Sequence, residues 1–379
     1  MMKNSVLFVT TISRTVEAFL IPHILYFLEK GYKVGVASNT QENKLENLEK
    51  LGVTIHHVPF SRAVTDKGNV VSYKIIKNII KHYHILHLHT PISSFVTRMA
   101  ASKQHTIIYT AHGFHFNENG TRITNFLFFA AEKIAGFKTN KLIVTNKDDL
   151  AAANKVISKQ KVQYVGGVGV DTSVYNIDIY SDKDKEDLKH DLKLDLNKKI
   201  ITHIAEFNQN KRQIDVLDAC EIIKQKTENF IILLVGEGED FKDIQKKIYD
   251  RKLDAFIKCL GFRDDIPRIL SITDIGLLVS IREGLSRSIM EMMAMNIPVI
   301  GTNIRGNRDL INHEENGYLV PIKNPHLLAE KCLQLLNSEN LCKQYGESGK
   351  RKIEHQHSIH HVLEQMELVY MELELLRNS

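Results

Sequence analysis

Features that mark membrane-spanning and secreted proteins are missing from this sequence of 379 residues. It contains no apolar run of about 18 residues, so no membrane-spanning helix is expected. The first residues, MMKNSVLFVTT, include a short apolar stretch, but no signal-length apolar region or small-residue cleavage site follows. The four cysteines are scattered and form no C-x-x-C pair, which agrees with a reducing compartment. We therefore expect a cytoplasmic protein.

Motifs of two common classes of nucleotide-binding protein are missing as well. No G-x-G-x-x-G follows the first predicted strand, and V-G-G-V-G falls at residues 165–169, between the predicted domains. This disfavours a dinucleotide-dependent oxidoreductase. No basic-aromatic RNA-binding motif or recognition-helix pattern is present, so we expect no nucleic-acid partner.

Charged residues are distributed unevenly along the chain. Residues 1–170 hold 21 lysines and arginines against 10 aspartates and glutamates, whereas the remaining residues hold 29 against 35. Between residues 62 and 141 the counts are 11 against 3. A basic field of this kind favours an anionic partner, either nucleic acid, an anionic membrane surface or a phosphorylated substrate. The alternative is a basic face that only contacts water.

Short apolar runs alternate with amphipathic segments along the whole chain. Strand-like runs such as SVLFVTT, ILHLHT and KLIVTN are separated by segments with helical apolar spacing, such as VVSYKIIKNIIKHY. This alternation predicts βαβ units around parallel sheets, and it restarts at KIITHIAEF. The sequence therefore predicts an α/β protein with two Rossmann-like, doubly wound domains that face each other across one cleft. The predicted domains are residues 1–175 and 176–355, followed by a last amphipathic helix over 356–379.

Two groups of residues that could suggest metal sites have a simpler interpretation. Asp182 and Asp184 resemble a metal-binding D-x-D pair, but the charged stretch around them favours the start of a solvated helix. His87 and His89 alternate in HYHILHLHT, so both are predicted to face one side of the sheet, with metal ligation as the alternative.

The segment REGLSRSIMEM, residues 282–292, has the features of a ligand site at a strand end. The preceding DIGLLVS predicts a buried strand, and Ser286 is a plausible N-cap for the helix that follows. Parallel sheets bind ligands beyond the carboxyl ends of their strands, and free amides at a helix start favour phosphate. Glu283 and Glu291 differ by about 80° around a helix, so both carboxylates can face one ligand.

Carboxylates beside a phosphate site repel the phosphate but accept hydrogen bonds from vicinal hydroxyls. The pattern therefore favours a ligand with a sugar on one side of a diphosphate and a ribose on the other. The spacing alone is weak evidence, because two glutamates eight residues apart are common on solvated helices.

Five segments, in the same order, resemble motifs of the glycosyltransferases of family four. EGLSRSIMEMMA at residues 283–294 resembles the motif E-G-F-G-x-x-x-x-E-A-M-A, and YTAHGFHF at 109–116 resembles the T-x-H-G strand end. The interdomain N-G-V-D segment, the V-G-D-G turn and the base-binding L-G-x-x-D-D segment have similar counterparts in GVGVDTSVY, VGEGED and LGFRDDIPRIL. The resemblance runs from the first strand to residue 340 or so, and forms such as IRGNRDLI are most similar to bacterial capsule and exopolysaccharide members.

The resemblance implies the GT-B fold, in which the C-terminal helix crosses back to the first domain. It implies transfer of a sugar from a nucleotide diphosphate donor, usually a UDP-sugar, with retention of configuration and without a bound metal or cofactor. Charge develops on the leaving diphosphate during such a transfer, so positioned donors and cations there lower the barrier.

The resemblance also implies roles for residues of this sequence. The candidate catalytic residues are His112 near the anomeric centre, Lys211 on the diphosphate and Glu283 on hydroxyls of the donor sugar. Glu291 would accept from the ribose hydroxyls. The predicted donor-binding residues are Arg212, Gly236, Phe262, Arg263, Glu283, Gly284, Leu285, Ser286, Arg287 and Glu291. A structural histidine and an exposed loop lysine are the alternatives for His112 and Lys211.

The sequence departs from the family's common pattern before Lys211. Many members have Gly-Arg five residues upstream, with the arginine on the diphosphate, whereas this chain has Ala205 and Glu206. A carboxylate cannot replace that cation. We hypothesise that Arg287 or Arg212 supplies it and that Glu206 orients Lys211. The departure also leaves open a non-catalytic, nucleotide-sugar-binding partner in a polysaccharide-assembly complex.

Acceptor binding is expected in the first, basic domain. Thr11, Ser13 and Arg14 lie in the first strand-to-helix loop, where the acceptor enters GT-B enzymes. The segment RITNFLFFAAEKIAGFKTNK mixes large apolar residues with cations, which suits a lipid diphosphate in the cytoplasmic leaflet and peripheral contact with the membrane. Packing in the core explains the apolar residues about as well.

Overall fold

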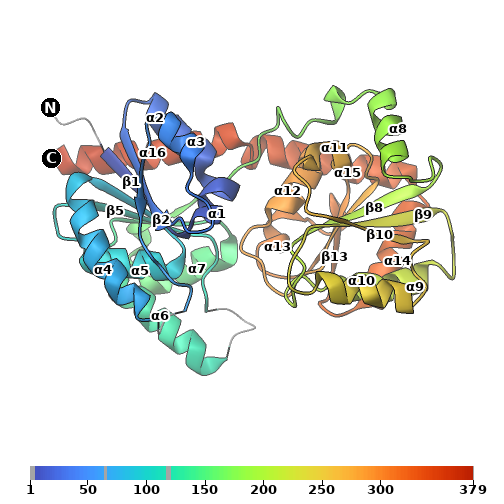
Figure 1. The fold of residues 1–379 in the computed structure, drawn as a ribbon, viewed down its shortest axis with the longest axis horizontal. Coiled ribbons are helices and arrows are strands. Elements are labelled where there is room, and N and C mark those ends of the chain that lie inside the picture. Colours follow the sequence, from blue (N-terminus) through green and yellow to red (C-terminus); the bar gives the residue numbers. More distant parts are fainter. Residues whose placement is uncertain (1–4, 64–65, 117–120, 379) are drawn as a thin grey trace. The chain divides into compact units, whose positions relative to one another are not determined.

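The computed structural model describes residues 5–63, 66–116 and 121–378, which form two compact units (Figure 1). Unit 1 is Met1–Val168 together with His360–Ser379, and unit 2 is Gly169–Ile359. The domain limits expected from the sequence, after residues 175 and 355, lie a few residues from these divisions.

Unit 1 is built on a sheet of seven parallel strands in the order β3-β2-β1-β4-β5-β6-β7. The central strands are buried on both faces, as expected for a parallel sheet that is covered on both sides. Its strands are β1 Ser5–Ile12, β2 Lys33–Asn39, β3 Thr54–His57, β4 Ile85–His89, β5 Thr106–Ala111, β6 Lys141–Val144 and β7 Val162–Tyr164. Its helices are α1 Ser13–Thr15, η1 Val16–Leu20, α2 Ile21–Glu29, α3 Glu46–Lys50, α4 Gly68–Ile79, η2 Ile80–His82, α5 Pro91–Ala100, α6 Arg122–Gly136, α7 Lys147–Val156, η3 Lys159–Lys161 and α16 Ile359–Asn378.

Alternate residues of β1 belong to separate cores on the two faces of this sheet. Val6 and Phe8 pack in one core with residues of α2 and α16. Leu7 and Val9 pack in the other core with residues of α4, α5 and α7. This two-sided burial follows from the period of two in a strand.

The last helix, α16, is part of unit 1, as the sequence predicted. Tyr370 of α16 stacks on Phe27 of α2 with ring centroids 4.1 Å apart. Glu372 of α16 accepts from Lys141 Nζ of β6 at 2.7 Å. The helix therefore completes the core of the first unit although it follows the second unit in the chain.

Unit 2 has a sheet of six parallel strands in the order β10-β9-β8-β11-β12-β13. Its strands are β8 Lys199–Ile204, β9 Phe230–Val235, β10 Ile257–Gly261, β11 Ile275–Leu278, β12 Val299–Thr302 and β13 Gly317–Val320. Its helices are η4 Ile177–Ile179, α8 Asp182–Asp191, α9 Gln213–Ile223, α10 Phe241–Asp250, α11 Ile266–Leu270, α12 Arg287–Ala294, α13 Asn307–Leu310, α14 Pro325–Leu336 and α15 Glu339–Gln356. The prediction of two units with parallel sheets is confirmed.

The charged stretch before β8 starts an exposed helix, as the sequence predicted. Ser181 caps α8 and accepts from the Asp184 amide at 3.2 Å, while the Asp184 carboxylate accepts from the Ser181 amide at 2.9 Å. Asp184 is thus part of a capping box, which satisfies two amides at the helix start. Across the described residues, none of the helices combines the length and the apolar character needed to cross a membrane.

Candidate functional site

The segment between β11 and α12 has the predicted arrangement of strand, loop and helix. The strand ends at Leu278 and the helix begins at Arg287, with Ser286 as the N-cap. Ser286 Oγ accepts from the Ile289 amide at 3.4 Å. The amides of Arg287 and Ser288 lie in the first turn, where no carbonyl of the same helix can accept from them. They form one side of the candidate site.

Both glutamates of this segment are bonded to cations. Lys211 Nζ donates to Glu283 Oε1 at 2.5 Å, and Arg287 Nε donates to Glu291 Oε1 at 2.7 Å. The side chains of Lys211 and Glu283 are 20% and 13% exposed, so water screens their pair only in part. The candidate site therefore brings the amides of α12 together with two carboxylate–cation pairs.

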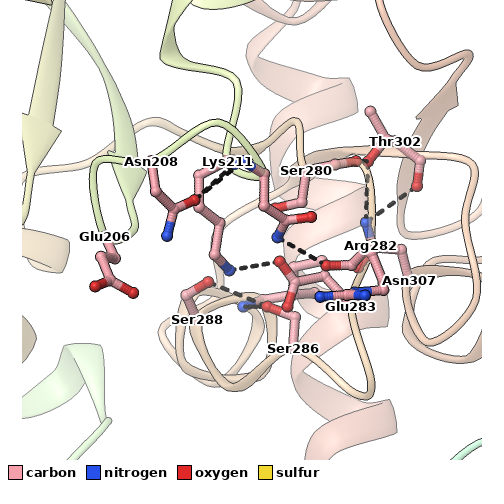
Figure 2. A network of polar contacts seen from close by, with 12 residues as sticks. Glu206, Asn208, Lys211, Ser280, Arg282, Glu283, Ser286, Ser288, Thr302 and Asn307 are labelled. Carbon is pink, nitrogen blue, oxygen red and sulfur yellow. Dashed lines mark hydrogen bonds and ion pairs between the residues drawn. The ribbon is translucent and has the colours of Figure 1, made fainter. Parts of the chain in front are cut away.

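Asparagines close a turn in the loop after β8 and tie this loop to the one after β11. Figure 2 shows Asn208 beside Lys211. Asn208 Oδ1 accepts from the Lys211 amide at 3.2 Å, which closes the turn that presents the lysine. Asn210 Nδ2 donates to the Arg282 carbonyl at 3.0 Å, and the Ile281 amide donates to the Asn210 carbonyl at 2.8 Å. Sequence reasoning missed both asparagines, and the partners of Asn210 lie about 70 residues away in the chain.

The loop after β12 supports Glu283 from another direction. Arg305 is buried, and its Nε donates to the Glu283 carbonyl at 3.3 Å. Gly306 has a φ of +79°, and a Cβ built there would lie 1.9 Å from the Gly284 carbonyl oxygen. Only glycine therefore allows this approach of the two loops. Arg305 lies in IRGNRDLI, a segment that resembles members of the family, but the sequence did not indicate this contact.

The end of β12 is bonded to the segment that follows β11. Thr302 Oγ1 donates to the Ser280 carbonyl at 2.6 Å, and Asn307 Nδ2 donates to the Thr302 carbonyl at 3.0 Å (Figure 2). These bonds hold two neighbouring strand ends in register beneath the candidate site.

Glu291 is almost fully buried, and Tyr175 lies against it. Burial raises the pKa of Glu291, while the Arg287 charge and hydrogen bonds from Tyr175 and Arg287 oppose the shift. Burial, followed by the negative charge of Glu291, raises the pKa of the Tyr175 hydroxyl well above its ordinary value. Tyr175 ends the segment GVGVDTSVY, so the resemblance contained a signal for it that sequence reasoning did not use.

The cations that could replace the missing arginine are themselves paired. Arg212 donates through Nε and Nη2 to both oxygens of Asp215, at 3.0 and 2.5 Å. Arg287 is paired with Glu291, as described above, and its side chain is 38% exposed. Lys211 is bonded to Glu283, whereas Glu206 is exposed and lies apart from the lysine (Figure 2). The hypothesis that Glu206 orients Lys211 is wrong for this structure.

Three further predicted donor-binding residues follow β9 and β10. Gly236 has a φ of +136°, and a Cβ there would lie 2.1 Å from the Ala205 carbonyl oxygen. Phe262 is 66% exposed. Arg263 Nε and Nη2 donate to the Asp265 carboxylate at 2.8 and 2.6 Å. Gly284 and Leu285 lie in the loop before α12.

In unit 1, His112 follows β5 and is bonded to a buried histidine. Its Nε2 lies 3.0 Å from Nδ1 of His89. Burial, followed by the charge of His23, lowers the pKa of His112 to about 4. His112 is therefore neutral near pH 7 and can act as a hydrogen-bond donor or acceptor.

The three predicted acceptor residues lie at the end of β1 and in α1. Thr11 Oγ1 is bonded to Thr90 Oγ1 at 2.8 Å, which connects the ends of β1 and β4. Ser13 is buried, and Arg14 is exposed. Among the residues that the structure describes, no three His, Cys, Asp or Glu side chains gather as metal ligands would.

The two parallel-sheet units define the GT-B fold of glycosyltransferases. A crystal structure of Alr3699/HepE from Anabaena in complex with UDP has this fold, with a TM-score of 0.81 at 18% identity over 98% of this chain and 100% of that one. Residues 184–352 match the family described as Glycosyl transferases group 1, and residues 5–146 match the family Glycosyl transferase 4-like.

Curated relatives agree with these family matches. The putative glycosyltransferase EpsD of Bacillus subtilis is 30% identical over 92% of each chain. The UDP-Gal:alpha-D-GlcNAc-diphosphoundecaprenol alpha-1,3-galactosyltransferase of Escherichia coli is 27% identical over 68% of this chain and 67% of its own. The chain therefore belongs to the group 1 glycosyl transferases.

Proposed function

We propose that the protein transfers a sugar from a UDP-sugar to a hydroxyl of a lipid-linked saccharide during synthesis of a capsule, exopolysaccharide or other surface glycan. The configuration at the anomeric carbon is retained, and no metal or cofactor takes part. The observation that carries this proposal is the arrangement of Glu283 and Glu291 on either side of the first turn of α12, with Lys211 bonded to the first of them.

Each group of this arrangement suits one part of such a donor. The first-turn amides and Lys211 offer hydrogen bonds and positive charge to the diphosphate. Glu291, held by Arg287 and Tyr175, accepts from the ribose hydroxyls, and Glu283 accepts from hydroxyls of the sugar. Gly236, Phe262 and Arg263, which follow β9 and β10, would contact the base.

The transfer requires stabilisation of the leaving group more than a strong base. The bond between the anomeric carbon and the diphosphate oxygen breaks, the acceptor oxygen bonds to that carbon, and the hydroxyl proton leaves with the nucleoside diphosphate. Negative charge grows on the diphosphate during this step. Lys211 and the first-turn amides therefore bind the transition state more tightly than they bind the donor, which lowers the barrier. As the resemblance implies, His112 would act on the donor near the anomeric centre.

Unit 1 would bind the acceptor at a membrane. Helix α6 exposes Ile123, Phe126, Leu127 and Ile134, and Phe137 directly after it is 84% exposed. Arg122, Lys133 and Lys138 supply positive charge in the same segment. A surface of this kind suits the cytoplasmic face of an anionic membrane. The E. coli relative acts on a diphosphoundecaprenol-linked sugar, which supports a lipid-linked acceptor here.

A screen of nucleotide sugars by thermal shift tests the donor assignment. We expect one UDP-sugar to raise the melting temperature of the native chain, and Glu291→Ala to abolish that rise, because the ribose loses its acceptor. Leu196→Ala, at an exposed position before β8, is the matched control and should retain the shift. If no nucleotide sugar stabilises the native chain, the donor assignment is wrong.

The replacement of the usual arginine by Glu206 favours a second candidate, a non-catalytic partner that binds a nucleotide sugar in a polysaccharide-assembly complex. Release of UDP from the stabilising donor separates the two. A transferase releases UDP, and a membrane lipid extract that contains the acceptor accelerates the release. Donor binding without any release would favour the non-catalytic partner.

A further inference from the structure

A group of histidines lies inside unit 1 beside His112, and most of it has no place in the proposed reaction. His87 and His89 lie on the same face of β4 and are 1% and 2% exposed. Their rings are stacked with centroids 4.4 Å apart, and Phe8 of β1 stacks on His89 at 6.0 Å. Both imidazoles are thus enclosed by other rings.

The rings of His89 and His112 meet edge to edge. Their centroids are 5.2 Å apart with an interplanar angle of 17°, and His89 Nδ1 lies 3.0 Å from His112 Nε2. In nearly parallel rings, this combination places the two nitrogens close to a common plane, as an imidazole hydrogen bond requires. The contact is therefore a hydrogen bond with one shared proton.

Both rings are neutral at physiological pH. Burial lowers the pKa of His89 well below its ordinary value, and the charges of His87, His112 and His23 lower it further. The pKa of His112 is lowered to about 4, as described above. One of the two facing nitrogens then carries a proton and the other a lone pair.

The surroundings of His89 indicate which nitrogen carries the proton. Both nitrogens of His87 have partners, the Tyr370 hydroxyl at 2.8 Å and Thr110 Oγ1 at 2.8 Å. Nε2 of His89 is buried and has no partner among the described residues. If His112 donated to His89, that Nε2 would carry a buried N–H without an acceptor, which native structures rarely contain. If His89 donates, no orphaned donor arises.

We propose that His89 is a positioning residue that donates from Nδ1 to His112 Nε2 and thereby holds His112 as the Nδ1–H tautomer. His112 is partly exposed, and Nδ1 is its remaining nitrogen, so the ring presents an N–H to a substrate oxygen. The tautomer of His112 follows from contacts within unit 1 alone. That its N–H donates to the sugar donor near the anomeric centre rests on the proposed function. His112 is then a hydrogen-bond donor and not a base.

The tautomer can be measured without any substrate. In the full chain labelled with ¹⁵N-histidine, two-bond nitrogen–proton couplings identify which nitrogen of His112 is protonated at pH 7, and His112→Gln assigns the signals. We expect Nδ1 of His112 to be protonated and Nε2 to be bare. We also expect His89→Leu to populate the Nε2–H tautomer. A native His112 with its proton on Nε2 would overturn the proposal.

Turnover separates a positioning role from a purely structural one. With a donor found by the thermal-shift screen, we expect His89→Leu to lower kcat about tenfold, because a transition-state hydrogen bond is misaligned, with little change in the donor KM. His89→Asn keeps an N–H near the Nδ1 position and should restore most of kcat. His87→Leu removes a neighbouring buried imidazole and should keep the wild-type kcat.

Equal losses of kcat in His89→Leu and His87→Leu, both shown to be folded by their thermal melts, would assign His89 a structural role and refute the positioning role. If the native chain turns over no nucleotide sugar, the proposed function fails. The tautomer of His112 still decides the assignment of His89 in that case.

Discussion

Glu283 and Glu291 are each bonded to a basic side chain, and the two pairs differ in burial. The Glu283–Lys211 pair joins residues from two loops, whereas the Glu291–Arg287 pair lies within one helix at a spacing of four residues. Glu291 has the more buried carboxylate of the two, and Tyr175 adds a further hydrogen bond to it. Arg287 can thus neutralise Glu291 and still lie beside the first-turn amides that would hold the diphosphate.

The residue that replaces the missing arginine can be identified by turnover. We expect Arg287→Ala to lower kcat/KM for the donor by about 10- to 100-fold, because a cation beside the diphosphate is lost and the buried Glu291 loses its partner. Arg212→Ala should lower kcat/KM by less than about threefold, since Arg212 is held by both oxygens of Asp215. Steady-state kinetics with the stabilising donor measure both changes.

Arg251→Ala is the matched control, because it breaks the pair between Arg251, directly after α10, and Asp218 of α9. Its kcat/KM should equal that of the native chain. Wild-type kinetics for both Arg287→Ala and Arg212→Ala would refute the hypothesis for these two residues. The exposed Arg282, in the loop between β11 and α12, would then be the next residue to substitute.

At the scale of elements, α6 is held to the rest of unit 1 by a buried ion pair. Arg98 of α5 is 1% exposed, and its Nη2 donates to Glu132 of α6 at 2.8 Å. The Arg98 guanidinium also lies over the ring of Tyr109, 4.4 Å from its centroid. This anchor fixes the inner face of the helix while its apolar side chains point outwards.

Removal of one partner of this pair should be costly. We expect Arg98→Met to lower the free energy of unfolding by about 3–5 kcal/mol, because Glu132 keeps a buried, uncompensated charge. Urea-induced unfolding followed by circular dichroism measures this loss. The double variant Arg98→Met/Glu132→Leu should recover most of it. A single variant as stable as the native chain would show that water or another group satisfies Glu132.

At the scale of the whole molecule, unit 1 exposes two apolar helix surfaces in different charge environments. The α6 surface has Arg122, Lys133 and Lys138 close by in the sequence. Helix α16 exposes Leu368, Met371, Leu375 and Leu376, but its charged neighbours include Glu364, Glu367, Glu372 and Glu374. An anionic membrane attracts the first surface and repels the second.

Vesicle flotation tests this difference. We expect the native chain to float with vesicles that contain anionic phosphatidylglycerol and to bind less at high salt. Phe126→Ser/Leu127→Ser should weaken binding at least about tenfold, because two large apolar side chains no longer enter the interface. Leu368→Ser/Leu375→Ser on α16 is the control and should bind as the native chain does. Equal loss in both double variants would argue against α6 as the membrane surface.

Local sequence patterns determined much of the fold and part of the site. The alternation of apolar runs and amphipathic segments was enough for two parallel-sheet units, because strand and helix periods are local properties. Ser286 as the cap of α12 and the capping box at Ser181 also depend on residues within three positions of each other. The family motifs placed Glu283, Lys211 and His112 in segments that follow strands, and Glu291 on the helix that follows Glu283.

Tertiary structure alone decided which of these residues are bonded to one another. Lys211 meets Glu283 and not Glu206, which is closer in the sequence; Arg305 donates to the carbonyl of Glu283, and His89 is bonded to His112. Tyr370 reaches His87 across 283 positions of the chain. Such contacts leave no periodic signal in a single sequence, since they depend on how the fold brings distant loops to one edge of a sheet and packs a helix on its face.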